Sequence, residues 1–321
     1  MLTELLDCRV LIVLGKGGVG KTVLSAAIAR LAAASGRRAL IMETDAGAPL
    51  ASTLGVEASF VPIDVAPNLS LMLLDGGHAL EEYLRLVVPG RMLLKAVFAS
   101  RVYQFFVQAA PGLRELMMLG KIYYEAERAP DDPNRHDLII VDAPASGQAL
   151  SMLKMPAAAH STFGDSTVGK ESRNISDLLH DRRRCAILQV TTSDSLSVSE
   201  TIETYAELNR LGMPPSAIIY NRATPFRFDA GDISSLLGRM RAAGRHRDHL
   251  AELAEAERLS AGESRKAATR IRRATHAPLI EVAEHGGIDG LDLIERVASD
   301  LAALDSIAGS SRFRNARPAA L

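Results

Sequence analysis

The nine residues from Leu14 to Thr22, LGKGGVGKT, constrain the fold of this chain more than any other stretch. An apolar run, Val10–Leu14, precedes them, and an Ala- and Leu-rich segment, Thr22–Gly36, follows and ends in a glycine of the kind that closes helices. A strand, a glycine-rich turn and a helix in this order begin a βαβ unit. The spacing G-x-x-x-x-G-K-T in that setting predicts a phosphate-binding loop.

The residue types of this predicted loop suit ATP and Mg²⁺. Glycines let the backbone turn tightly and point successive N–H groups at phosphate oxygens, and the helix that follows adds its positive amino-terminal end. Lys21 is expected to reach the β- and γ-phosphates, and the Thr22 hydroxyl is expected to bind Mg²⁺. The remaining residues expected to contact the nucleotide here are Gly15, Lys16, Gly17, Gly18, Val19 and Gly20.

Six more apolar runs bounded by turn residues follow, with helical stretches between them. Most show no strict alternation of polar and apolar residues, as expected of strands buried on both faces of a parallel sheet. The sequence therefore predicts an α/β fold with a doubly wound, mostly parallel sheet, whose ligands bind beyond the carboxyl ends of the strands. The runs are Ala39–Met42, Leu69–Leu74, Leu138–Val141, Ala186–Val190, Ala217–Tyr220 and Pro278–Val282.

Two long helical patterns interrupt this rhythm. Residues 76–130 are predicted to form a helical insertion subdomain, and residues 224–275 a mostly polar helical segment. Both are assigned to one predicted ATPase domain that spans residues 1–321.

The form GKGGVGKT, with a lysine directly after the first glycine, resembles the deviant Walker A loop. Proteins with this loop include the arsenite-pump ATPase (ArsA), the ATPases that target tail-anchored proteins, the Min and Par ATPases and the nitrogenase iron protein. In that class the additional lysine, here Lys16, crosses a two-fold interface to the nucleotide of the other subunit and neutralises charge on the transferred phosphoryl group. The resemblance implies that Lys16 is catalytic and that ATP closes a dimer, either a homodimer or a heterodimer with a paired homologue.

Two aspartates follow predicted strands, as phosphoryl transfer to water requires. Asp142 comes after four apolar residues in the Walker B form and is expected to hold Mg²⁺ through water. DAPASGQAL, from Asp142, resembles the switch D-T-A-P-T-G-H-T-L of the ArsA and tail-anchored-targeting branch, with Gln148 in place of its histidine; this implies that Gly147 senses the γ-phosphate. That branch begins its first switch with D-P-A-H. TDAGAPL keeps the acid as Asp45, the implied water-positioning residue, but lacks the proline and histidine, so hydrolysis is expected to be slow or dependent on a partner.

The same resemblance places adenine beside two later segments. Asn221 in IIYNRATP matches the family asparagine that binds the base, and its amide offers both a donor and an acceptor. The segment from Pro278 onward resembles the second adenine-side loop.

The insertion is where this branch carries its helical client-binding subdomain. Arg91–Ala109 has only a narrow polar stripe, and methionines and aromatic residues suit a groove for varied apolar helices. Packing of these side chains against one another and the sheet explains the pattern equally well. The candidate groove residues are Met92, Phe98, Phe105, Phe106, Met117 and Met118.

Composition argues against several other functions. A net charge of −1 and the absence of tryptophan do not favour nucleic-acid binding. The two cysteines, Cys8 and Cys185, lie outside the switch regions, and the polar segment lacks the C-x-x-C of the eukaryotic targeting ATPases, so neither zinc nor an Fe–S cluster is expected. No signal peptide or apolar run of ~18 residues is found, which predicts a cytoplasmic protein without stable membrane insertion.

These observations predict a dimeric ATPase that binds and releases a hydrophobic client or partner as ATP closes the dimer. A Par- or Min-like positioning ATPase, or a regulatory subunit that acts with a paired homologue, is the alternative.

Overall fold

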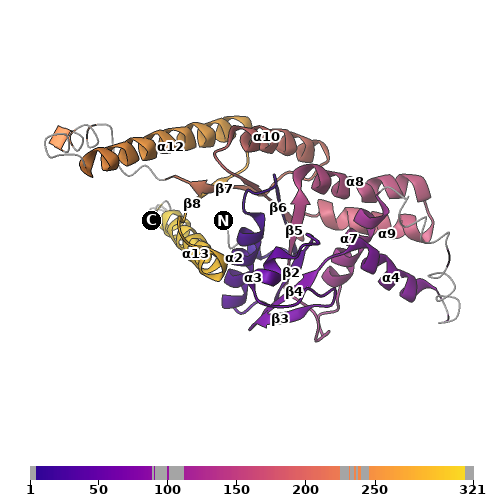
Figure 1. Ribbon diagram of the computed structural model, residues 1–321. Helices are drawn as coiled ribbons and strands as arrows, with labels where there is room; N and C mark the ends of the chain where they lie inside the picture. The colour runs from indigo at the N-terminus through magenta and orange to yellow at the C-terminus, as the bar shows by residue number, and fades with distance from the viewer. Residues whose placement is uncertain are drawn as a thin grey trace, which may run out of the picture.

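An eight-stranded sheet forms the centre of the computed structural model, which describes residues 5–88, 90, 100, 112–224, 231, 235, 238–239 and 246–314 (Figure 1). All neighbouring strands are parallel except β3 and β4, which are antiparallel at one edge. The order along the sheet is β3 (Ile63–Ala66), β4 (Leu69–Leu73), β2 (Ala39–Glu43), β5 (Leu138–Ala145), β1 (Val10–Gly15), β6 (Cys185–Thr191), β7 (Ala217–Ala223) and β8 (Leu279–Ala283).

The predicted mostly parallel sheet is confirmed, and all seven predicted runs form strands. The edge strand β3 was not predicted, because Ile63–Ala66 is short and not continuously apolar. Two strands extend further than expected. Asp142 lies within β5, paired with Val13 on one side and Glu43 on the other, and Asn221 lies within β7. Backbone pairing to both neighbours keeps the polar Asp142 in the sheet.

Helices cover both faces of the sheet (Figure 1). One face packs against α2 (Lys21–Ala34), α3 (Pro49–Thr53) and α13 (Gly290–Arg314). The other packs against α7 (Leu113–Ala126), α8 (Ser146–Phe163) and α9 (Thr167–His180), and further along, over β7, against α10 (Ser195–Arg210) and α12 (His246–Ala274).

Strand β1 shows why polar and apolar residues do not alternate in the sequence of the strands. Leu11 and Val13 face the layer that contains α2, whereas Val10 and Ile12 face the layer that contains α7 and α8, and all four side chains are fully buried. Both sides of such a strand must be apolar.

The described part of the predicted insertion is helical. Helix α4 (Gly76–Val87) packs along α7, and Asp75 caps α4 by accepting a hydrogen bond from the backbone N–H of His78 at 2.9 Å. Helix α12 lies within the predicted polar segment.

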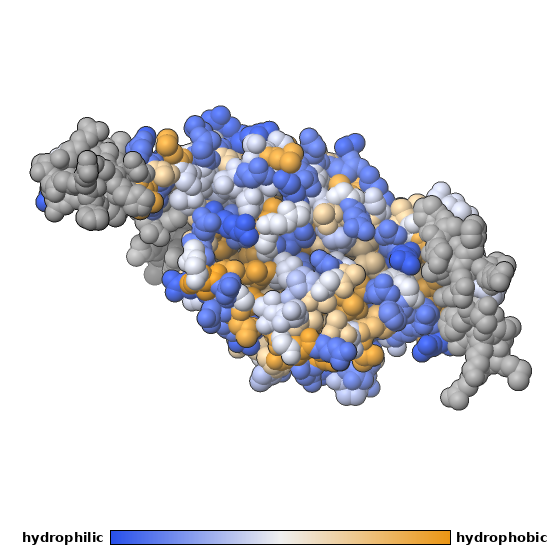
Figure 2. Space-filling view, viewed as in Figure 1, coloured by the Kyte–Doolittle hydropathy of each residue, from blue (hydrophilic) through white to orange (hydrophobic). Residues whose placement is uncertain are grey.

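Hydrophilic and hydrophobic residues are interspersed over the face seen in Figure 2, and the hydrophobic ones are most frequent in its lower half. None of the helices in the described part of the chain is long and apolar enough to span a membrane.

Candidate functional site

The predicted phosphate loop joins the end of β1 to the start of α2, at the carboxyl edge of the sheet. Gly18 and Gly20 have φ angles of 82° and 94°, a left-handed conformation that glycine adopts without the penalty of a side chain. A Cβ atom at Gly15 would overlap the carbonyl oxygen of Val190 on β6. At Gly15, Gly18 and Gly20 the spacing of the glycines therefore matches positions where this backbone excludes or disfavours other residues.

Lys21 folds back over the loop. Its Nζ donates to the carbonyl oxygens of Gly15 at 3.0 Å and Lys16 at 3.2 Å. Burial lowers the pKa of Lys21, and the Asp142 carboxylate opposes this shift. A phosphate in the loop would give this partly buried ammonium group a negative partner in place of neutral carbonyls.

Thr22 and Asp142 come together although 120 positions separate them. The Thr22 hydroxyl donates to Asp142 Oδ2 at 2.7 Å, and Ser25 Oγ lies 3.5 Å from Asp142 Oδ1. Asp142 is 4% exposed, and burial raises its pKa. Hydroxyl and carboxylate oxygens are ligands that Mg²⁺ prefers, so the chemistry of this pair fits the predicted metal.

Asp45 lies at the same edge, in the loop between β2 and α3. It is exposed, and its Oδ1 accepts a hydrogen bond from the Gly47 backbone N–H at 2.8 Å. The adjacent residue Thr44 donates from its hydroxyl to the Asp142 backbone carbonyl at 2.7 Å. Asp45 is thus near the predicted metal pair and accessible to solvent, as a water-positioning group must be.

Glu43 is a site residue that sequence reasoning missed. Its side chain is 1% exposed and accepts hydrogen bonds from the backbone N–H groups of Leu50 at 2.6 Å and Ala51 at 3.2 Å. These are amides of the first turn of α3, whose N-cap, Ala48, has no side chain to bind them. Glu43 therefore closes the loop that carries Asp45. An acidic residue at the end of an otherwise apolar strand was the available signal.

Asp194 is the second missed residue. It caps α10 by accepting from the backbone N–H of Ser197 at 2.9 Å, and the same oxygen, Oδ2, lies 3.1 Å from Lys16 Nζ. Asp194-x-x-Ser197 is a recognisable helix-start pattern, but nothing in the sequence links it to Lys16. Lys16 thus points away from Lys21 and toward α10.

Two residues predicted to contact the nucleotide, Asn221 and Gly147, lie beside the phosphate loop or at the same edge of the sheet. The Asn221 side chain donates from Nδ2 to the Val19 carbonyl oxygen at 2.8 Å and is 7% exposed. Gly147 is exposed in the first turn of α8, which follows β5 directly. Both are at the carboxyl edge, where the roles predicted for them require them to be.

Pro278 does not join this site, which corrects its assignment as an adenine contact. It precedes β8, its carbonyl oxygen accepts from Ile218 N near the start of β7, and it borders a pocket with Cys8 and Arg182. These positions are at the amino ends of parallel strands, the edge opposite to the phosphate loop. The residues after β8, from Glu284, reach the carboxyl edge instead.

Of the candidate groove residues, Met117 and Met118 lie on α7 and are partly buried against the core. Met92, Phe98, Phe105 and Phe106 lie outside the described residues.

Within the described ranges, no group of three or more His, Cys, Asp or Glu side chains is placed to hold a metal ion. Both cysteines are free and buried, and burial raises the pKa of Cys8 to about 12. The absence of zinc and of an Fe–S cluster stays a prediction.

Comparison with known proteins relates the chain to ATPases. A sequence model described as anion-transporting ATPase (ArsA_ATPase) matches residues 8–168, which contain the phosphate loop, Asp45, Asp142 and Gly147. The chain is 29% identical over 241 residues to the ATPase BagA of Mycobacterium tuberculosis, covering 72% of this chain and 70% of that protein. It is 25% identical over 231 residues to the arsenical pump-driving ATPase of Acidiphilium multivorum, covering 66% of this chain and 39% of that protein.

Proposed function

Because the chain belongs to the ArsA family of anion-transporting ATPases and is an ATPase, we propose that it works as a dimer that ATP closes and that this closure binds and releases a hydrophobic client or partner. Thr22 and Asp142 would hold Mg²⁺, which neutralises phosphate charge when bound. Lys21 would bind the phosphates, and Asp45 would orient the attacking water.

The position of Lys16 carries the dimer proposal. Its amino group lies on Asp194, outside the loop, where it makes no contact that a nucleotide in the same subunit needs. The Lys16 and Asp194 side chains are 29% and 51% exposed. Ion pairs this exposed contribute at most about 1 kcal/mol, so Lys16 can exchange Asp194 for a phosphate presented by a second subunit.

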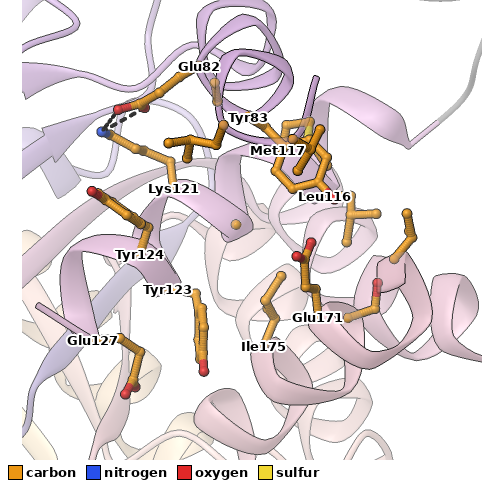
Figure 3. A pocket seen from close by; sticks show the side chains of 16 residues that line it. Glu82, Tyr83, Leu116, Met117, Lys121, Tyr123, Tyr124, Glu127, Glu171 and Ile175 are labelled. Carbon is orange, nitrogen blue, oxygen red and sulfur yellow. Dashed lines mark hydrogen bonds and ion pairs between the residues drawn. The ribbon is translucent and has the colours of Figure 1, made fainter. Parts of the chain in front are cut away.

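An apolar cavity supports the proposal that the protein binds a hydrophobic client. It lies between α4, α7 and α9, includes Met117 in its wall and has a volume of about 290 Å³ (Figure 3). Leu86 and Val87 at the end of α4 are 68% and 45% exposed beside it. Exposed aliphatic side chains next to an apolar cavity are typical of a binding surface.

The test uses Asp45→Asn, which should retain ATP binding, lose hydrolysis and accumulate the ATP-bound dimer. Light scattering with and without MgATP, for this variant and for Asp45→Asn combined with Lys16→Ala, should show ATP-dependent dimers only when Lys16 is present. Equal dimerisation by both variants would contradict the proposal.

The trapped dimer also tests whether the protein binds a hydrophobic client. A purified peptide with one apolar helical segment should bind the trapped dimer saturably and compete for it with a second such peptide. Binding of DNA or anionic vesicles without binding of the peptides would favour a positioning ATPase instead.

A further inference from the structure

The cavity between α4, α7 and α9 has an uneven charge distribution, which limits the kinds of ligand that it can bind. Its wall is mostly aliphatic and aromatic, and Figure 3 shows the side chains of three helices converging on it. The apolar and aromatic part of the wall includes Tyr83 of α4, Leu116, Met117, Tyr123 and Tyr124 of α7, and Ile175 of α9.

Two of the three carboxylates that line the cavity are already paired with basic side chains. Glu82 Oε2 lies 2.8 Å from Lys121 Nζ, and Glu127 forms an ion pair with Arg184. Lys121 is itself 6% exposed and also contacts Glu125 at 3.0 Å. These pairs leave little net charge for a ligand to meet.

Glu171 differs from the other two. Within the described ranges no ion pair joins it to a basic residue, and burial together with this nearby carboxylate raises the pKa of Tyr83 to about 12. Figure 3 shows its carboxylate between α9 and the Leu116 side of α7, above Ile175. A negative charge at an apolar wall attracts a cation more strongly than the same charge in water.

The aromatic side chains favour the same kind of ligand. Tyrosine rings attract cations through their negative faces, and they do so while burying apolar surface. Tyr83 and Tyr123 line a cavity of about 290 Å³ together with Glu171, whereas the third tyrosine, Tyr124, already has Lys121 Nζ at 5.3 Å and Arg128 at 5.2 Å from its ring centre. That volume is near the lower end of the range for small-molecule sites, ~300–1,000 Å³, and suits a short chain with one head group.

We propose that this cavity binds a small apolar molecule that carries one positive charge, an alkyl or aryl ammonium compound, with the charge at Glu171 and the apolar part between Tyr83, Tyr123 and Met117. The inference rests on the proposed function, since it uses the cavity assigned to a hydrophobic client, and it specifies the ligand's charge.

Three probes with an eight-carbon chain test the proposal: octyltrimethylammonium, octanoate and 1-octanol. Isothermal titration calorimetry measures the binding of each to the whole protein, with the two charged probes kept below their critical micelle concentrations. The cation should bind saturably and at least about tenfold more tightly than either of the others. Equal affinity for all three would overturn the charge selection while leaving an apolar site for a client. No binding of any probe would overturn the inference and remove the cavity from the client proposal.

Two matched variants locate the charge. Glu171→Gln should weaken octyltrimethylammonium binding at least about tenfold and leave 1-octanol binding unchanged, whereas Glu127→Gln, in the same cavity but paired with Arg184, should change cation binding less than about twofold. Equal losses in both variants would contradict a specific role for Glu171. ATP hydrolysis and the MgATP-dependent dimer report on the proposed function separately, because neither glutamate is at the phosphate loop.

Discussion

The phosphate-loop edge and helix α7 place their charged side chains in different ways. At the edge, Lys16 and Lys21 bind an exposed carboxylate and backbone carbonyls, partners that a nucleotide can replace. On α7, Glu125 is 1% exposed and lies between Lys121, at 3.0 Å, and Arg128. Replaceable partners are typical of a binding site, whereas this buried carboxylate between two cations belongs to a group of ion pairs that joins α7 to α4 through Lys121 and Glu82.

The role of a charged residue in these two regions follows from its partner more closely than from its burial. Asp142 and Glu125 are both nearly inaccessible, at 4% and 1% exposed. Burial raises the pKa of Asp142, which has only hydroxyl donors and a distant lysine, while Arg128 and Lys121 outweigh burial and lower the pKa of Glu125. The first carboxylate is prepared for a cation that arrives with the nucleotide, and the second already has its cations.

The largest expected effect is on stability, from Glu125→Ala. Removing the carboxylate leaves the buried Lys121 ammonium with Glu82 as its remaining carboxylate partner, so the free energy of unfolding should fall by about 1.5–3 kcal/mol. Chemical denaturation measures the change. Glu127→Ala, two residues away in an exposed pair with Arg184, is the control and should cost less than about 1 kcal/mol. ATP hydrolysis per folded molecule should be retained in both variants.

The opposite pattern is expected for Lys21→Ala, which should lower kcat/KM for ATP by about a hundredfold or more while leaving the free energy of unfolding nearly unchanged. The Lys21 ammonium contacts only loop carbonyls here, so its loss removes no structural partner. Steady-state hydrolysis and denaturation curves test this together, with the exposed Lys266→Ala as control. A stability loss as large as that of Glu125→Ala would show that Lys21, like Glu125, is part of the structure that stabilises the fold.

Glu43 combines features of both regions, because it is a buried structural group within the phosphate-loop edge. Glu43→Ala should lower kcat about tenfold by loosening the loop that carries Asp45, with a smaller change in KM. Glu43→Gln keeps one oxygen for the Leu50 amide and should recover part of kcat. If both variants change only stability, Glu43 holds α3 without positioning Asp45.

The smallest expected effect is a pH dependence of stability that comes from His136. His136 is 8% exposed, contacts Ser70 Oγ at 3.2 Å, and burial lowers its pKa. Below pH ~6.5 the unfolded chain takes up a proton that folded His136 resists, so stability should fall as pH decreases from 7 to 5.5, by at most ~1.4 kcal/mol per pH unit. The free energy of unfolding of His136→Gln should depend less on pH over this range. Equal slopes would show that His136 does not titrate this way.

Much of the fold was predictable, because strands buried on both faces leave continuous apolar runs that are visible without knowing their partners. The edge strand β3 was missed because its burial is partial and its pairing with β4 is local. At the site, the glycines, Lys21, Thr22 and Asp142 were identified from spacing, and the structure brings them together. Pro278 was misplaced because it is the first residue of the predicted run Pro278–Val282, and a parallel strand begins at the edge opposite to the loop that follows it.

Short segments of the sequence encode the phosphate loop, the parallel sheet and the family, since these depend on local backbone conformations and on apolar periodicity. Three contacts could be seen only in the folded chain: Lys16 rests on Asp194, Glu43 closes the loop of Asp45, and Glu171 faces an apolar cavity while Glu82 and Glu127 are paired. These contacts join segments distant in the chain, and the energy of a charge depends on which neighbours reach it in space.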